Sequence, residues 1–120
     1  MATTKTILST TVYGEASGNY DGSSQDWSSD PVEAADYYRG HGGLQTVRFS
    51  LADFVGIMHV EATLDPDFDT AAWFETYVLG DDSTPLNGIY STSILGNFTW
   101  IRVRVELFDA GTIDYVTVTY

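Results

Sequence analysis

Apolar residues recur at every second position along much of this 120-residue chain, and this spacing is typical of half-buried β-strands. The clearest case is the stretch GNFTWIRVRVELF, residues 96–108. Its period assigns to a buried face Ile101, Val103, Val105 and Leu107. The outward face then carries Trp100, Arg102, Arg104, Glu106 and Phe108. A slip of one residue would bury both arginines, so the pattern specifies which face is buried.

Seven segments show this pattern and are rich in Val, Ile, Thr and aromatic residues, which favour strands. They are 6–13, 44–50, 53–64, 73–79, 89–93, 98–108 and 113–120. Asp109-Ala110-Gly111 predicts a hairpin turn that pairs the last two segments antiparallel. The segment DPVE, residues 30–33, has the form of a helix start, and at most one helical turn is expected there.

This order of strands, with almost no helix, predicts an all-β fold in a single domain spanning residues 1–120. We expect an antiparallel two-sheet β-sandwich of seven or eight strands. Jelly-roll connectivity is favoured over the immunoglobulin-like alternative, because the Cys…Trp…Cys hallmark of that fold is missing from this cysteine-free chain.

A long polar loop is predicted at about residues 14–31, GEASGNYDGSSQDWSSDP. Such a loop is uncommon in a compact domain unless it binds something or packs on a neighbour. Trp27 lies within it, and exposed Trp27, Tyr20 and Tyr38 could stack on sugar rings. The alternative is that a small sandwich needs large side chains to fill its core. These aromatic residues therefore suggest a carbohydrate-binding β-sandwich module as one function.

Charge and composition argue against several classes of function. Seventeen acidic residues against five basic ones give a net charge of −12, which disfavours binding to nucleic acid or to an anionic membrane. Without cysteine, neither a disulfide nor a thiolate metal site can form. No apolar run has the length needed to span a bilayer, and no signal peptide is recognisable, so we expect synthesis and folding in a cytoplasm.

Candidate catalytic chemistry is sparse. The two histidines, His41 and His59, are not accompanied by a nucleophile-elbow motif or a distinctive acid pair, so we expect neither an enzyme nor a cofactor. The carboxylates of Asp65, Asp67 and Asp69 alternate as at the start of a calcium loop. The glycine at the sixth position of such a loop and the acid at its twelfth are missing, so this is a weak calcium candidate and a polar strand connection is favoured.

The outward row of residues 100–108 admits two interpretations. In the first, neighbouring strands supply acids and aromatics opposite the arginines, and the row stabilises the sheet through cross-strand pairs. In the second, Trp100, Arg102, Arg104 and Phe108 form an interface, because tryptophan and arginine are favoured at the buried anchors of protein contacts.

Eight short segments occur in order along the chain: YY (37–38), LQTV (44–47), FVG (54–56), VEATL (60–64), WF (73–74), NGIYS (87–91), GNFTWIR (96–102) and GTI (111–113). The series resembles small β-sandwich virion structural proteins and fibre-like modules of tailed bacteriophages, notably the large contractile-tailed phages of marine cyanobacteria. It covers roughly residues 36–120.

This resemblance implies a virion structural protein in head decoration, neck, tail or fibre, without catalytic residues or cofactor. It implies protein–protein contacts with other virion proteins and with further copies of the chain, hence a homo-oligomer. The implied location is the virion, assembled in the host cytoplasm. Binding of a surface glycan is compatible with such a role.

Overall fold

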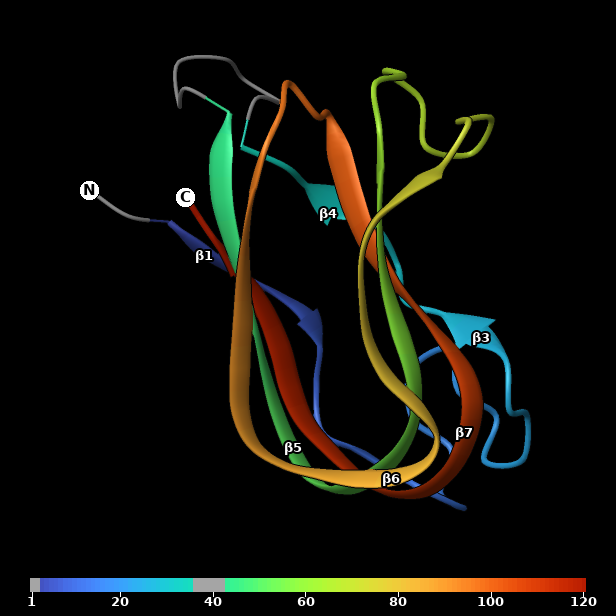
Figure 1. Ribbon diagram of the computed structural model, residues 1–120. Coiled ribbons are helices and arrows are strands. Elements are labelled where there is room, and N and C mark those ends of the chain that lie inside the picture. Colours follow the sequence, from blue (N-terminus) through green and yellow to red (C-terminus); the bar gives the residue numbers. More distant parts are fainter. Residues whose placement is uncertain (1–2, 36–42) are drawn as a thin grey trace.

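The computed structural model describes residues 3–35 and 43–120. Its seven strands are β1 (Thr4–Leu8), β2 (Thr11–Val12), β3 (Trp27–Ser28), β4 (Val32–Glu33), β5 (Leu44–Thr63), β6 (Phe74–Leu95) and β7 (Trp100–Thr119). All pair antiparallel in one sheet of order β1-β7-β5-β6, and β2, β3 and β4 also pair with β7 (Figure 1). No helix occurs among the described residues. The fold is therefore all-β, as the sequence pattern predicts.

The three long strands β5, β6 and β7 each turn sharply near the middle, so the sheet is folded over on itself (Figure 1). In the first half, residues 44–51 of β5 pair with 88–95 of β6, and 46–51 pair with 113–119 of β7. In the second half, residues 56–62 of β5 pair with 74–81 of β6, and 57–63 pair with 100–106 of β7. Each long strand thus contributes one limb to each half.

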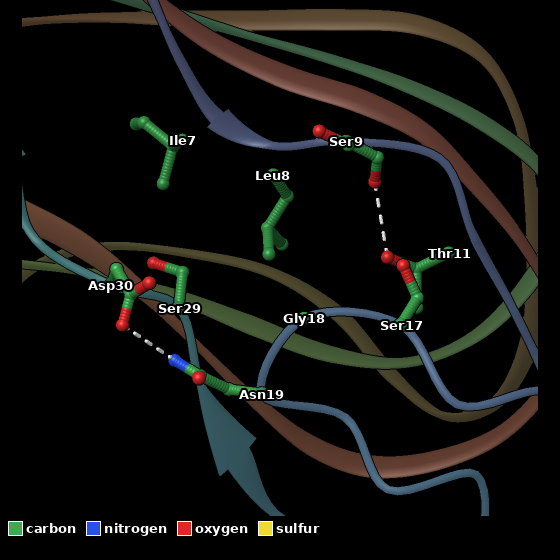
Figure 2. Close-up of a pocket in the computed structure, with 9 residues that line it drawn as sticks. All are labelled: Ile7, Leu8, Ser9, Thr11, Ser17, Gly18, Asn19, Ser29 and Asp30. Atoms are coloured by element: carbon green, nitrogen blue, oxygen red, sulfur yellow. Dashed lines mark hydrogen bonds between the residues drawn. The ribbon is translucent and has the colours of Figure 1, made fainter.

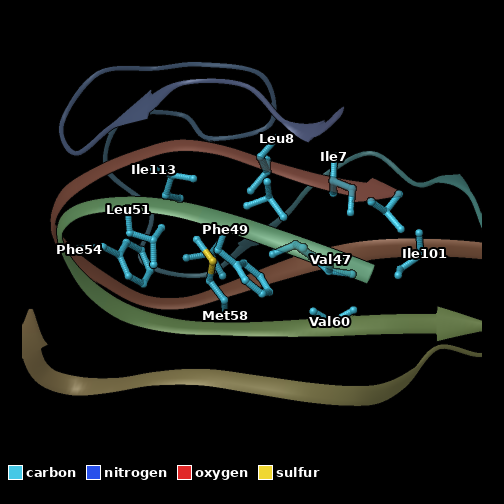
Figure 3. Packing of buried hydrophobic residues seen from close by; sticks show 14 of the residues in the cluster. Ile7, Leu8, Val47, Phe49, Leu51, Phe54, Met58, Val60, Ile101 and Ile113 are labelled. Atoms are coloured by element: carbon cyan, nitrogen blue, oxygen red, sulfur yellow. The ribbon is translucent and has the colours of Figure 1, made fainter. Parts of the chain in front are cut away.

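The core lies between the two halves. Val47 and Phe49 project inward from the first limb of β5, and Met58 and Val60 project inward from the second (Figure 3). All four side chains are fully buried. Because apolar faces of both halves meet in one cluster, the single bent sheet buries its own hydrophobic surface.

Local backbone conformation explains the bend. Asp53 in β5 and Leu107 in β7 have φ angles of 53° and 54°, and β-bulges interrupt the pairing of β5 with both neighbours around residue 53. Glycine is required beside them at Gly80 and Gly111, which have φ angles of 99° and 90°. A Cβ at Gly80 would overlap the carbonyl oxygen of Gly56, and one at Gly111 would overlap that of Asp53.

The expected two-sheet sandwich with jelly-roll connectivity is not confirmed, because all strands belong to one sheet. The segments 44–50 and 53–64 are two limbs of β5, and 73–79 and 89–93 are two limbs of β6. The predicted hairpin at Asp109-Ala110-Gly111 is wrong. There β7 bends and continues, and both of its limbs pair with β5 rather than with each other. The helical turn expected at residues 30–33 is also wrong, since β4 forms there and pairs with β7.

The predicted alternation in β7 holds up to the bend and then fails. Ile101, Val103 and Val105 are fully buried, as expected. Leu107, expected inside, is 36% exposed, whereas Phe108, expected on the outward face, is fully buried. The positive φ of Leu107 shifts the alternation by one residue, so the outward row ends at Glu106.

Candidate functional site

The outward row of β7 belongs to a charged cluster that crosses three strands in the second half of the sheet. Its members are His59, Glu61, Glu75, Arg102, Arg104 and Glu106. Glu61 of β5 lies opposite Arg102 of β7 in the strand register. One oxygen of its carboxylate accepts from Nε of Arg102 at 2.8 Å, and the other accepts from Nε of Arg104 at 3.3 Å. The Glu61 side chain is only 12% exposed, so one largely buried carboxylate is paired with two guanidinium groups.

Aromatic side chains flank these ion pairs. The guanidinium of Arg102 lies 4.3 Å from the ring centroid of Trp73, a cation–π distance. The indole N–H of Trp100 donates to the carbonyl oxygen of Pro66 at 3.1 Å, and its ring meets that of Phe68 edge-on. Acids and aromatics from neighbouring segments therefore pair with the outward row, as the first interpretation of that row requires.

His59 of β5 connects the cluster to β6. Its Nδ1 contacts Glu75, and its Nε2 lies 2.9 Å from Oε1 of Glu106. The imidazole ring of His59 therefore connects a carboxylate of β6 with a carboxylate of β7.

The proposed sugar platform is wrong for the residues that the structure describes. Tyr20 and Trp27 are buried, with ring centroids 5.3 Å apart, and both pack on Phe108. The physical reason is that the 14–31 loop packs both rings against Phe108 at the bend of β7, so they become part of the core. Tyr38 lies outside the described residues.

Two of the three carboxylates of the weak calcium candidate, those of Asp65 and Asp67, accept hydrogen bonds from the backbone of their own turn. Asp65 accepts from the N–H of Ala72 at 2.7 Å, and Asp67 accepts from the N–H of Asp69 at 2.9 Å. Within residues 3–35 and 43–120, no group of three or more side chains is arranged to hold a metal ion. The turn is therefore explained by its internal hydrogen bonds.

A shallow pocket of about 210 Å³ lies between β1 and the 14–31 loop (Figure 2). It is lined by Ile7, Leu8, Ser9, Thr11, Ser17, Gly18, Asn19, Ser29 and Asp30. The amide of Asn19 donates to Asp30 at 3.0 Å, and the hydroxyl of Thr11 donates to the carbonyl oxygen of Ser9 at the same distance. Among the described residues, none that lines this pocket is aromatic.

Sequence reasoning missed the open edge of the sheet. β6 ends the strand order and, in the part of the chain that the structure describes, pairs only with β5. None of its 22 residues is buried. Ile89 and Leu95 are 65% and 73% exposed. Strand order cannot be deduced from periodicity, but one signal was available: residues 83–101 carry no charge in a chain that is otherwise rich in acids.

Comparison with known proteins gives no relative: no protein-family model, no curated protein and no solved structure matches the chain. The resemblance to phage virion proteins therefore stays a prediction. Among the described residues, no helix is long and apolar enough to cross a membrane.

Proposed function

We propose that this protein is a structural component of the virion of a tailed bacteriophage, in head decoration, neck, tail or fibre. It acts through contacts with other virion proteins and with further copies of itself. The virion assignment rests on the sequence resemblance. The observation that carries the protein-contact part is the long, open edge of β6.

An unpaired edge presents a row of backbone N–H and C=O groups that can pair with a strand of another chain. Proteins usually protect such edges with lysine, proline, charged side chains or short strands. In β6 the charged residues and Pro85 lie in the limb that belongs to the second half of the sheet and at the bend. The limb that belongs to the first half, residues 86–95, has neither, and we call it the open limb. This limb is therefore suited to contact with another protein chain.

The remaining features of the chain fit assembly of many copies. A net charge of −12 keeps separate copies soluble and prevents association at the acidic surfaces. The ion pairs around Glu61 connect β5 with β7 in the second half of the sheet, while the first half carries the open limb. In this proposal, the facing halves of the sheet serve as the two layers of a jelly-roll-like sandwich.

Carbohydrate binding is the second candidate function, and the pocket beside β1 is the observation that favours it. Its hydroxyl groups, together with Asn19 and Asp30, are polar groups of the kind that bind sugar hydroxyls. Glycan-array binding that is lost in Asn19→Ala would support this function. No binding across the array would reject it.

Quantitative mass spectrometry of purified particles from the source of this chain tests the main proposal. The measured quantity is the copy number relative to the major capsid protein. Parity or a simple fraction of it identifies head decoration, and a few copies per particle identify neck, tail or fibre. Absence from the particles would contradict the proposal.

A further inference from the structure

The open limb of β6 reads nearly the same in both directions. Residues 89–95 are IYSTSIL, which in either direction gives two apolar residues, Ser, Thr, Ser and two apolar residues. Thr92 is the midpoint. Such a pattern is what a strand needs in order to pair antiparallel with a copy of itself, because a two-fold axis places residue i opposite j and j opposite i.

Burial separates the two faces of this limb. Ile89, Ser91, Ser93 and Leu95 are exposed on the outer face. Tyr90 and Ile94 are partly buried and pack against the core from the inner face. Each face is symmetric about Thr92 in residue type, so pairing of two copies matches outer side chains with outer side chains and inner ones with inner ones.

We propose that two copies of the chain pair antiparallel along residues 89–95, about a two-fold axis at Thr92. This inference rests on the proposed function, since it names the partner at the β6 edge. Ile89 then lies opposite Leu95 of the second copy, and Ser91 lies opposite Ser93 of the second copy. The first halves of the two copies, each containing β1 and one limb each of β7, β5 and β6, become one continuous sheet across the axis.

Exposure favours this register. Ile89 and Leu95 are the most exposed large hydrophobic residues of the described chain, at either end of the limb. The proposed register places them against each other, where both lose contact with water. Any shift by one residue would instead place an outer side chain opposite an inner one.

The distribution of charge favours a second copy of the chain as the partner at the β6 edge. Two chains of net charge −12 repel each other at most surfaces, but residues 83–101 carry no charge. Among the β5 residues that pair with the limb, the charged one is Arg48, which lies opposite Ser91 and over the ring of Tyr115. The two Arg48 side chains would be separated by both β6 strands, about 14 Å, which exceeds the screening length at physiological salt.

A charge-swap experiment tests the pairing and its register. One variant carries Ile89→Lys and Leu95→Lys, and the other carries Ile89→Glu and Leu95→Glu. In either variant alone, like charges meet across the axis, and self-association weakens by about 100-fold or more. In an equal mixture, Lys meets Glu at both ends, and the mean charge equals that of the wild type. The matched control is Leu64→Lys with Val78→Lys, which adds the same charge at exposed apolar positions away from the limb.

The readout is mass by light scattering after size-exclusion chromatography, over a wide range of protein concentration. The expected result is twice the 13.2 kDa chain mass for wild type, control and mixture, and the single-chain mass for each charge variant alone. Circular dichroism confirms that each variant is folded. A monomeric wild type, charge variants that still dimerise, or a mixture that stays monomeric would each overturn the proposal. These outcomes do not decide whether the chain is present in particles, which the copy-number measurement tests separately.

Discussion

The ring of Tyr20 packs against the ring of Phe108, with centroids 5.1 Å apart. Tyr20 lies in the polar 14–31 loop and Phe108 lies at the bend of β7, and both are buried. The Tyr20 hydroxyl also accepts from the N–H of Gly14 at 2.9 Å. The loop is therefore anchored to the core where the sheet folds over, and it is part of the structure that holds the bend.

Tyr20→Ala should lower the free energy of unfolding by about 3 kcal/mol, because it removes a fully buried ring from the aromatic cluster. Tyr20→Phe keeps the ring and loses only the hydroxyl that accepts from Gly14, so about 1 kcal/mol is expected. Urea denaturation followed by tryptophan fluorescence measures both. Equal effects of the two substitutions would show that the ring does not anchor the loop.

Gly111→Ala should destabilise the protein by about 3 kcal/mol, since it combines an unfavourable positive φ with overlap on the backbone of Asp53. Gly14→Ala is the matched control. Its φ of 86° is close to the 90° of Gly111, but no atom lies within 4 Å of the added Cβ. About 1 kcal/mol is expected for the control. Thermal and urea unfolding measure the difference, and similar losses at both glycines would contradict the account of the bend.

Glu61→Gln should cost about 1–2 kcal/mol, because it removes the carboxylate shared by Arg102 and Arg104 and leaves two neighbouring cations without it. Glu15→Gln, at an exposed position in the loop, is the control and should change stability by less than about 0.5 kcal/mol. The measurement is urea denaturation at neutral pH. No difference between the two variants would show that the charged cluster does not stabilise the sheet.

The carboxyl group of Asp21 should titrate at an unusually low pH. Hydrogen bonds from the backbone N–H of Ser23 and Ser24, then from the Ser24 hydroxyl, lower its pKa to about 2 from an ordinary value of 3.8. A folded-state pKa below the unfolded one means that the stabilisation is complete above the unfolded pKa and is lost as pH falls through 3.8 toward 2.

NMR titration of the Asp21 side-chain carbon measures this pKa directly, and Asp21→Asn provides the stability control. The stability difference between wild type and Asp21→Asn should be constant near neutral pH and should shrink between pH 3.8 and 2. A titration midpoint at the ordinary value would mean that the Ser23 and Ser24 hydrogen bonds do not persist in solution.

The sequence predicts the strands of this fold better than it predicts their pairing. Alternation places Ile101, Val103 and Val105 in the core because a strand has a strict two-residue period. It fails at Leu107 and Phe108 because the positive φ of Leu107 shifts the alternation by one residue. The sequence pattern does not predict that backbone conformation. Asp109-Ala110-Gly111 suits either a hairpin or a bend, and only the matching bend of β5 decides between them.

In the candidate site, too, the sequence predicts some features and not others. The sequence specifies that Arg102 and Arg104 share the outward face of their strand, but Glu61 becomes their partner only through the pairing of β5 with β7, which the sequence leaves open. The burial of Tyr20 and Trp27 cannot be predicted from the sequence, because it depends on their contact with Phe108 at the bend of β7. The open edge of β6 is likewise a property of strand order, and its sequence signal is the uncharged run at 83–101.

Contact with partner chains along the open limb of β6 should protect the backbone amides of that limb. Amide hydrogen exchange of residues 89–95, compared between concentrated and dilute protein, tests it most directly. We expect strong protection of the outer-edge amides in concentrated protein and rapid exchange after dilution, while the amides of residues 101–105 in β7 exchange equally slowly in both. Exchange in the limb that does not depend on concentration would contradict the claim.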